Sequence, residues 1–377
     1  MEKDTNFYAK KKGYVYRKTT LGMTSLSIVF PMGSGYETIG RRGISHLMEH
    51  LITKPLDKFN TFFTSNCIEF NAYTSVNNVV VHFKGMEEYL NPEVKQKMID
   101  TVLHGFSEVT EEQFETEKQI VLQELADVQM DPFYSNLINI LYGRYRVLPP
   151  TGFKRDIINF TFEEAKEMAK DVFTKPIRIV DIANRKTEYK NVEYRENCPY
   201  SKKLSYHPMD REIYTVQKCD NSFVFSVYKK PVNKLDYIFA HMGLEMLFSG
   251  LESPFFQEIR EKRGLCYDIS YSLDYITHNS VLSIGMSVEK KNVKTLVSVL
   301  NDMFKNIKTY LTRERFESIK KQYTIYNKII KILRYSKNNS LVEAEIPCFY
   351  LRLDDITYEK VCEIIEMIFN DMEIIVK

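Results

Sequence analysis

The residues best suited to chemistry are His46 and His50, with Glu49 between them. Histidines four positions apart lie on one face of a helix and can bind the same metal ion. A carboxylate beside the second histidine can take a proton from a water molecule at that ion. This spacing is H-x-x-E-H, and its chemistry is zinc-assisted peptide hydrolysis. The alternative is a surface helix whose two histidines make ordinary hydrogen bonds.

A catalytic zinc site needs a third protein ligand, and the natural place to look for it is a second helix with an inward-facing carboxylate. Residues 110–130 supply such a helix, which begins at a capping box formed by Thr110 and Gln113. Glu117 and Glu124 are two turns apart and share a face with the apolar residues of this helix. Carboxylates in that position are unfavourable unless they are paired or bind a metal. Solvated carboxylates on a charge-rich helix are the alternative.

Several motifs, taken in order, resemble the pitrilysin/insulinase family of zinc metallopeptidases, in the branch that includes the mitochondrial processing peptidase. The matching segments are GSGYE at 33–37, GISH at 43–46, NAYTS at 71–75, the Glu117…Glu124 pair, LPPTG at 148–152 and REKRGLCY at 260–267. The family continues after the second histidine through an apolar, glycine-containing loop. This chain has Leu51-Ile52-Thr53-Lys54-Pro55 at that place. The family resemblance therefore does not predict the shape of the substrate pocket.

The resemblance implies one zinc ion per chain, held by His46, His50 and Glu124. It implies that Glu49 is the catalytic base and that Glu117 supports the site from close by. The residues that this resemblance assigns to pairing with an extended substrate are Asn71, Ala72, Tyr73 and Thr74.

Arg260 and Tyr267 match an arginine and a tyrosine that reach the substrate from the second domain in catalytic members of the family. There they can hydrogen-bond the peptide carbonyl or the oxyanion that develops in the transition state. The alternative places Arg260 on a solvated helix face and Tyr267 at the start of a core strand.

An internal repeat is visible without the family. Residues 109–118 recur as 311–320 at an offset of 202, and residues 160–166 recur as 356–362 at an offset of 196. Shared capping chemistry explains one such match, but less easily two in the same order. The repeat therefore indicates two related α+β domains.

We expect a zinc-binding domain at 1–190, a linker at 191–210 and a homologous domain at 211–377. Each domain is predicted to be a mostly antiparallel sheet covered by helices, and the two together form one half of a clamshell. The second domain lacks H-x-x-E-H, and its Ile319 and Tyr326 align with the two glutamates of the first domain at the offset of 202. We therefore expect it to lack the metal site and to supply the arginine and tyrosine contacts.

Composition describes an ordinary globular chain of 377 residues with a net charge of +2, 44% hydrophobic and 27% charged residues. The charge favours neither a nucleic acid nor an anionic membrane as a partner. The charged start of the chain does not resemble a signal or transit peptide, and no apolar run is long enough to span a membrane.

The six cysteines form no CxxC pair, which is typical of reduced thiols, so we expect a cytoplasmic protein. The five other histidines lack partners at metal spacing and are expected to be structural or exposed.

The function predicted from the sequence is that of a zinc metalloendopeptidase acting on peptides or on leader and pro-segments. A general degrader of peptides and a dedicated processing enzyme share this chemistry, so both stay open. A non-catalytic or scaffold subunit of a heterodimeric peptidase is the alternative function. In the family that the chain resembles, two such halves face each other as in a closed clamshell, so the resemblance implies a homodimer or a heterodimer with a related half.

Overall fold

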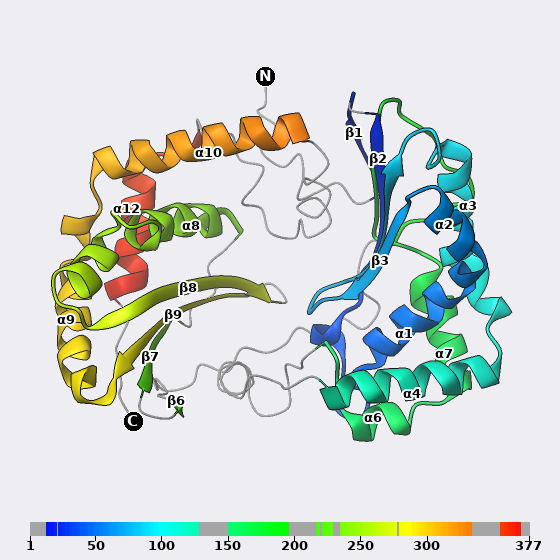
Figure 1. The fold of residues 1–377 in the computed structure, drawn as a ribbon, viewed down its shortest axis with the longest axis horizontal. Helices are drawn as coiled ribbons and strands as arrows, with labels where there is room; N and C mark the ends of the chain where they lie inside the picture. Colours follow the sequence, from blue (N-terminus) through cyan, green and yellow to red (C-terminus); the bar gives the residue numbers. More distant parts are fainter. Residues whose placement is uncertain are drawn as a thin grey trace. The chain divides into compact units, whose positions relative to one another are not determined.

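The computed structural model describes residues 13–20, 22–127, 150–195, 216–218, 221–228, 234–276, 279–333 and 355–370. Contacts divide the chain into two compact units. One unit contains a five-stranded sheet and the other a four-stranded sheet, each accompanied by helices (Figure 1). This mixed architecture confirms the predicted fold class. Within the described ranges, no helix has both the length and the apolar character needed to cross a membrane.

The sheet of the first unit has the strand order β1-β5-β2-β4-β3. Its strands are β1 (Gly13–Lys18), β2 (Met23–Phe30), β3 (Glu69–Thr74), β4 (Val79–Met86) and β5 (Arg178–Ala183). All neighbours pair antiparallel except β1 and β5, which are parallel. Strand β3 therefore lies at one edge of the sheet, next to β4.

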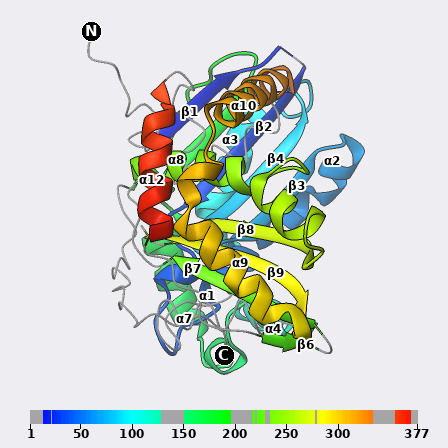
Figure 2. The ribbon, with the colours of Figure 1, turned by 90° about the vertical axis from the view of Figure 1, so that its left-hand side faces the viewer.

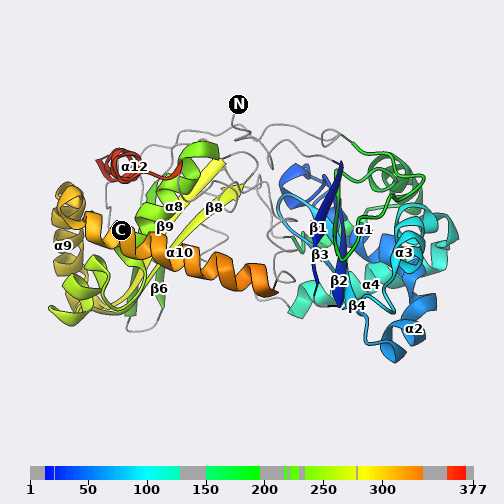
Figure 3. The same ribbon diagram turned by 90° about the horizontal axis from the view of Figure 1, so that it is seen from above.

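Helices cover one face of this sheet (Figure 1, Figure 3). The α-helices are α1 (Ile44–Thr53), α2 (Asn60–Ser65), α3 (Pro92–His104), α4 (Glu111–Asp127), α6 (Lys154–Ile158) and α7 (Phe162–Met168). Shorter turns of 3₁₀ or π helix are η1 (Ser34–Tyr36), η2 (Lys54–Phe59), η3 (Gly105–Glu108) and η4 (Ala169–Phe173). The predicted capping box starts α4, because Thr110 and Gln113 exchange backbone-to-side-chain hydrogen bonds of 3.0 and 3.2 Å.

The core of this unit lies between the sheet and its helices. On β4, Val81 and Phe83 alternate toward the core, as the two-residue period of a strand requires. Leu47 and Leu51 of α1 are fully buried in the same core. Their burial fixes the rotation of α1 and turns the neighbouring residues 46 and 50 toward α4, which α1 contacts.

The second unit has the strand order β6-β7-β9-β8, and all of its pairings are antiparallel. Its strands are β6 (Val216–Lys218), β7 (Asn221–Tyr228), β8 (Cys266–Ile276) and β9 (Asn279–Glu289). Its helices are α8 (Lys234–Phe248), η5 (Phe256–Glu261), η6 (Lys290–Asn292), α9 (Val293–Lys305), η7 (Ile307–Tyr310), α10 (Arg313–Leu333) and α12 (Tyr358–Asn370). Helix α9 lies across β7 and β9 (Figure 2). Gly243 lets α12 approach α8, because a Cβ there would be 2.1 Å from Ile365.

The internal repeat of the sequence appears as the same contact in both units. The Lys118 ammonium on α4 donates to the Phe160 carbonyl over 3.0 Å. Lys320 on α10 donates to the Ile356 carbonyl, also over 3.0 Å. Each lysine ties the corresponding long helix to the start of the next repeated segment.

The expected linker begins with residues that pack on the first unit. Tyr189, Val192 and Tyr194 are partly buried against its core. Residues 191–195 therefore continue the first unit, and residues 196–210 lie outside the described residues. The domain boundaries stay a prediction.

A buried ion pair joins helix α3 to strand β5 in the first unit. The Lys95 ammonium on α3 lies 2.6 Å from Asp181 Oδ1 on β5, and both side chains are buried. The hydroxyls of Tyr14 and Tyr189 donate to the other oxygen over 2.8 and 2.9 Å. Three donors therefore offset the loss of water around one buried carboxylate.

Replacing Asp181 by Asn should destabilise the first unit by about 3–5 kcal/mol, because the Lys95 ammonium stays buried without a counter-charge. Urea unfolding followed by circular dichroism measures this change. Glu69→Gln is the matched control, because its partner Lys84 and its own carboxylate are solvated and such pairs contribute less than about 1 kcal/mol. Equal unfolding midpoints for the two variants would contradict a stabilising role for the buried pair.

Candidate active site

The start of helix α1 is held by a buried carboxylate from the preceding loop. Glu37 accepts hydrogen bonds from the backbone N–H groups of Gly43 and Ser45 over 2.7 and 2.8 Å. It thereby satisfies donors that the first turn of a helix leaves free. Burial raises the pKa of Glu37 to about 7, against the lowering effect of these hydrogen bonds.

A second set of hydrogen bonds holds the residues just before α1. Asp156 of α6 accepts from both the backbone N–H and the guanidinium of Arg42. Gly43 has a left-handed φ of 92° and touches Gly152, where a Cβ would be only 2.0 Å from the Gly43 Cα. This close approach explains why glycine occupies both positions. The loop after residue 150 therefore fixes where α1 begins.

Helices α1 and α4 bring His46, His50 and Glu124 together. The Nε2 atoms of His46 and His50 lie 3.4 and 3.7 Å from Glu124 Oε2. These three form a group of possible ligands whose donor atoms all lie within 4.8 Å of one another. In a tetrahedral zinc site with bonds of about 2.0–2.2 Å, the donors are about 3.3–3.6 Å apart. The two distances from the histidines to Glu124 are close to this spacing.

The protonation state of His46 also suits a metal. Burial lowers the pKa of His46 to about 4, with a further contribution from His50. His46 is therefore neutral at pH 7, the form of imidazole that binds metals. Its buried Nδ1 has no hydrogen-bond partner among the described residues.

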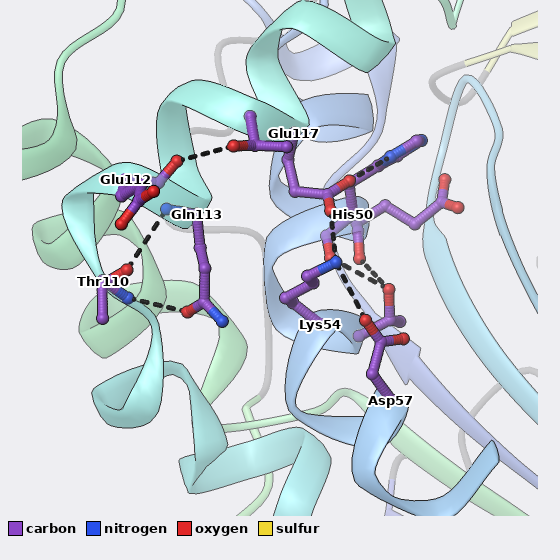
Figure 4. Close-up of polar contacts among 10 residues, drawn as sticks. His50, Lys54, Asp57, Thr110, Glu112, Gln113 and Glu117 are labelled. Atoms are coloured by element: carbon purple, nitrogen blue, oxygen red, sulfur yellow. Dashed lines mark hydrogen bonds and ion pairs between the residues drawn. The ribbon is translucent and has the colours of Figure 1, made fainter. Parts of the chain in front are cut away.

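His50 differs, because its Nδ1 atom lies 3.2 Å from Glu117 Oε2 (Figure 4). A proton shared with that carboxylate stays on Nδ1 and leaves Nε2 free for a metal. The other oxygen of Glu117 lies 2.8 Å from the Lys54 ammonium. Hydrogen bonding to His50 and Lys54 lowers the pKa of Glu117 despite its burial. Glu117 thus contacts His50, and the supporting role that the family resemblance implies for it stays a prediction.

Glu49 lies on α1 beside these ligands. It is buried, and one of its oxygens, Oε2, accepts a hydrogen bond of 2.6 Å from the Thr74 hydroxyl. Burial raises the pKa of Glu49, against the lowering effect of that hydrogen bond. Its carboxylate is therefore a better proton acceptor than an exposed one.

Strand β3 carries the four residues predicted to bind substrate. It is an edge strand, and its outer edge has no strand partner in the part of the chain that the structure describes. Asn71 is exposed, whereas Ala72 packs against the core. Thr74 hydrogen-bonds Glu49, a contact that the sequence did not indicate. The edge position leaves the β3 backbone able to pair with an added strand.

Arg260 and Tyr267 lie together in the second unit. The Arg260 guanidinium is 4.7 Å from the centre of the Tyr267 ring and 4.6 Å from that of Phe256. Tyr267 lies near the start of β8, as the alternative expected, but its side chain is 79% exposed and is not in a core. Cation–π contact holds the two donors side by side on the surface of this unit.

The other histidines of the described ranges have ordinary surroundings. His82 Nδ1 is 2.8 Å from the Ser27 hydroxyl, and His241 Nδ1 is 3.0 Å from the Tyr323 hydroxyl. His104 is exposed. His207 and His278 lie outside the described residues. In the second unit, buried Ile319 stands at the position equivalent to Glu117.

Comparison with protein families assigns both parts of the chain. Residues 15–147 match the model described as insulinase (peptidase family M16). Residues 158–323 match the model described as the peptidase M16 inactive domain. The two models belong to one family and match in consecutive order. The chain belongs to the pitrilysin/insulinase family.

Relatives of this M16 chain carry the name of zinc proteases. An uncharacterized zinc protease of Rickettsia bellii is 23% identical over 350 residues, which cover 85% of this chain and 82% of the relative. The uncharacterized zinc protease YmxG of Bacillus subtilis is 22% identical over 292 residues, covering 71% and 68%. The family and these relatives support a peptidase in general.

Solved structures of M16-like proteins share the fold. A protease from Helicobacter pylori superposes with a TM-score of 0.73 at 17% identity, covering 96% of this chain and 95% of the other. A peptidase M16 inactive domain from Pseudomonas fluorescens gives 0.72 at 14% identity, covering 98% and 95%. At these identities the likeness concerns the fold alone.

Proposed function

We propose that this M16 chain is a zinc-dependent metalloendopeptidase that hydrolyses peptides, or leader and pro-segments, bound in extended form. The observation that carries the proposal is the convergence of His46, His50 and Glu124 next to a buried Glu49. Two imidazoles and one carboxylate are a donor set that catalytic zinc sites use. Zinc bound by these three residues would supply Lewis-acid chemistry, polarising a peptide carbonyl and lowering the pKa of water.

Glu49 moves the proton in this mechanism. Thr74 donates to its Oε2 atom, and Oε1 has no hydrogen-bond partner among the described residues. Oε1 therefore accepts a proton from the attacking water and passes it to the leaving amine. The raised pKa of Glu49 brings proton uptake and release closer to neutral pH.

Substrate binds as an added strand along the outer edge of β3. Main-chain pairing of this kind gives affinity with little demand on sequence. Arg260 and Tyr267 supply donors to the substrate carbonyl from a second domain, either of a second copy of this chain or of a related half-partner. Their surface position in the second unit suits such a contact.

Metal content and peptidase activity, measured on the same preparation, test the proposal. We expect elemental analysis to find about one zinc per chain. A quenched-fluorescent peptide should be cleaved, chelator should stop cleavage, and added zinc should restore it. Absence of zinc after reconstitution would overturn the proposal. Zinc without cleavage of any peptide in a panel would favour a scaffold or partner-dependent subunit.

Thr74→Val separates two roles for this threonine. If its hydroxyl orients Glu49, kcat should fall by about tenfold while KM and zinc content stay unchanged, because a hydrogen bond to a charged group contributes about 1.5–3 kcal/mol. If Thr74 instead binds substrate, as the family resemblance suggests, KM should rise with kcat unchanged. Thr116→Val is the control, because the exposed Thr116 hydroxyl donates to the carbonyl of Glu112 in its own helix.

A further inference from the structure

Glu117 is bound from two sides by side chains of one continuous helical segment. His50 Nδ1 lies 3.2 Å from one carboxylate oxygen, and Lys54 Nζ lies 2.8 Å from the other. The Glu117 side chain is only 7% exposed. A carboxylate this deeply buried depends on such partners, because water cannot replace them fully. Figure 4 shows Glu117 reaching from α4 to both residues.

Lys54 is placed for this contact by the chain itself. It follows His50 by one helical turn, and its backbone N–H donates to the His50 carbonyl at the junction of α1 and η2. Its side chain therefore rises on the same side as the imidazole. Asp57 of η2 lies 2.9 Å from the same ammonium and holds it from the outside. The segment 51–55, where the sequence departs from the family pattern, thus supplies a cation directly behind the candidate ligands.

We propose that Lys54 is a positioning residue of the metal centre. Its ammonium holds Glu117 against His50 Nδ1 and so keeps His50 Nε2 aimed at Glu124. This role rests on the proposed zinc site. Three carboxylates, those of Glu49, Glu117 and Glu124, surround His50, and Lys54 is the cation that contacts Glu117 within the described residues. Without it, one Glu117 oxygen loses its partner, and the carboxylate can rotate away from His50.

Metal affinity of the full chain is the direct readout, measured by competition for Zn²⁺ with a chromophoric chelator. Lys54→Met should weaken Zn²⁺ binding by about tenfold, the lower end of the effect of partners behind a metal ligand. Lys54→Arg keeps the charge and should restore affinity to within about threefold of the unaltered chain. The visible spectrum of the Co²⁺-loaded protein should change for Lys54→Met and return with Lys54→Arg.

Lys58→Met is the matched control. Lys58 belongs to the same 3₁₀ helix and pairs with Glu108 over 2.7 Å, but both side chains are solvated. It should leave Zn²⁺ affinity and the Co²⁺ spectrum unchanged. Equal losses of affinity in Lys58→Met and Lys54→Met would overturn the proposal, since the effect would then reflect general disturbance of η2.

A double-mutant cycle tests whether Lys54 acts through Glu117. In a Glu117→Gln background, Lys54→Met should cost less than about twofold in Zn²⁺ affinity, because the contact it serves is already gone. A tenfold loss in both backgrounds would overturn the proposal, as would unchanged affinity of the single variant. Failure of the unaltered chain to bind Zn²⁺ would overturn the proposed function, and the role of Lys54 with it.

Discussion

Glu49→Gln should leave about one zinc per chain and lower kcat by about 10²–10⁴-fold, the range for loss of a positioned acid–base group. The amide keeps the size of the carboxylate and still accepts the Thr74 hydrogen bond. It has no basic oxygen that can take a proton from water. The expected result therefore separates proton transfer from metal binding in a single substitution.

Zinc by elemental analysis and kcat with a fluorogenic peptide are measured on the same preparation of this variant. Glu115→Gln is the control, because that carboxylate is solvated on α4 and pairs only with neighbouring Lys118. It should match the unaltered chain in both measurements. Cleavage by Glu49→Gln at the normal rate would mean that another group takes the proton, and the mechanism would be wrong.

The sequence predicted the parts of the candidate site that obey local spacing. The i, i+4 histidines and the capping box at Thr110 depend on positions within one helix, so periodicity alone places them. Glu117 and Glu124 share a face of one helix for the same reason. The structure adds that this face meets α1, which gives the carboxylates their partners.

The contacts that the sequence did not predict join elements through space. Glu37 closes onto the start of α1 because Gly43 adopts a left-handed conformation. Thr74 reaches Glu49 because the register of β3 against β4 places Thr74, the last residue of β3, beside α1. No spacing rule carries this information, since it depends on sheet register and helix packing together. Lys54 combines both cases. The sequence predicts that it lies one helical turn after His50, but it does not predict the ion pair with Glu117 on α4.

Sheet order shows the same limit. The place of strand β5 between β1 and β2 follows from packing of residues far away in the chain. The strand pairs parallel with β1 and antiparallel with β2. That insertion brings Asp181 to Lys95, a pair that spacing could not reveal.

His50→Ala should lose both the metal and the activity. His50 contributes a donor atom directly, so its removal should weaken Zn²⁺ binding beyond the roughly 10–100-fold that supporting partners cost. Glu117 and Lys54 would keep each other, because their 2.8 Å ion pair does not pass through the imidazole. The fold should therefore survive, and an unchanged thermal midpoint of the metal-free proteins checks that it does.

His104→Ala is the control for this loss, because His104 is an exposed histidine at the end of α3 in the same unit. It should keep both zinc and activity. If His50→Ala bound Zn²⁺ as tightly as the unaltered chain, His46 and Glu124 would have to bind without it, and the proposed ligand set would be wrong. Together with Glu49→Gln, which keeps the metal but not the reaction, this variant assigns metal binding and proton transfer to neighbouring residues of one helix.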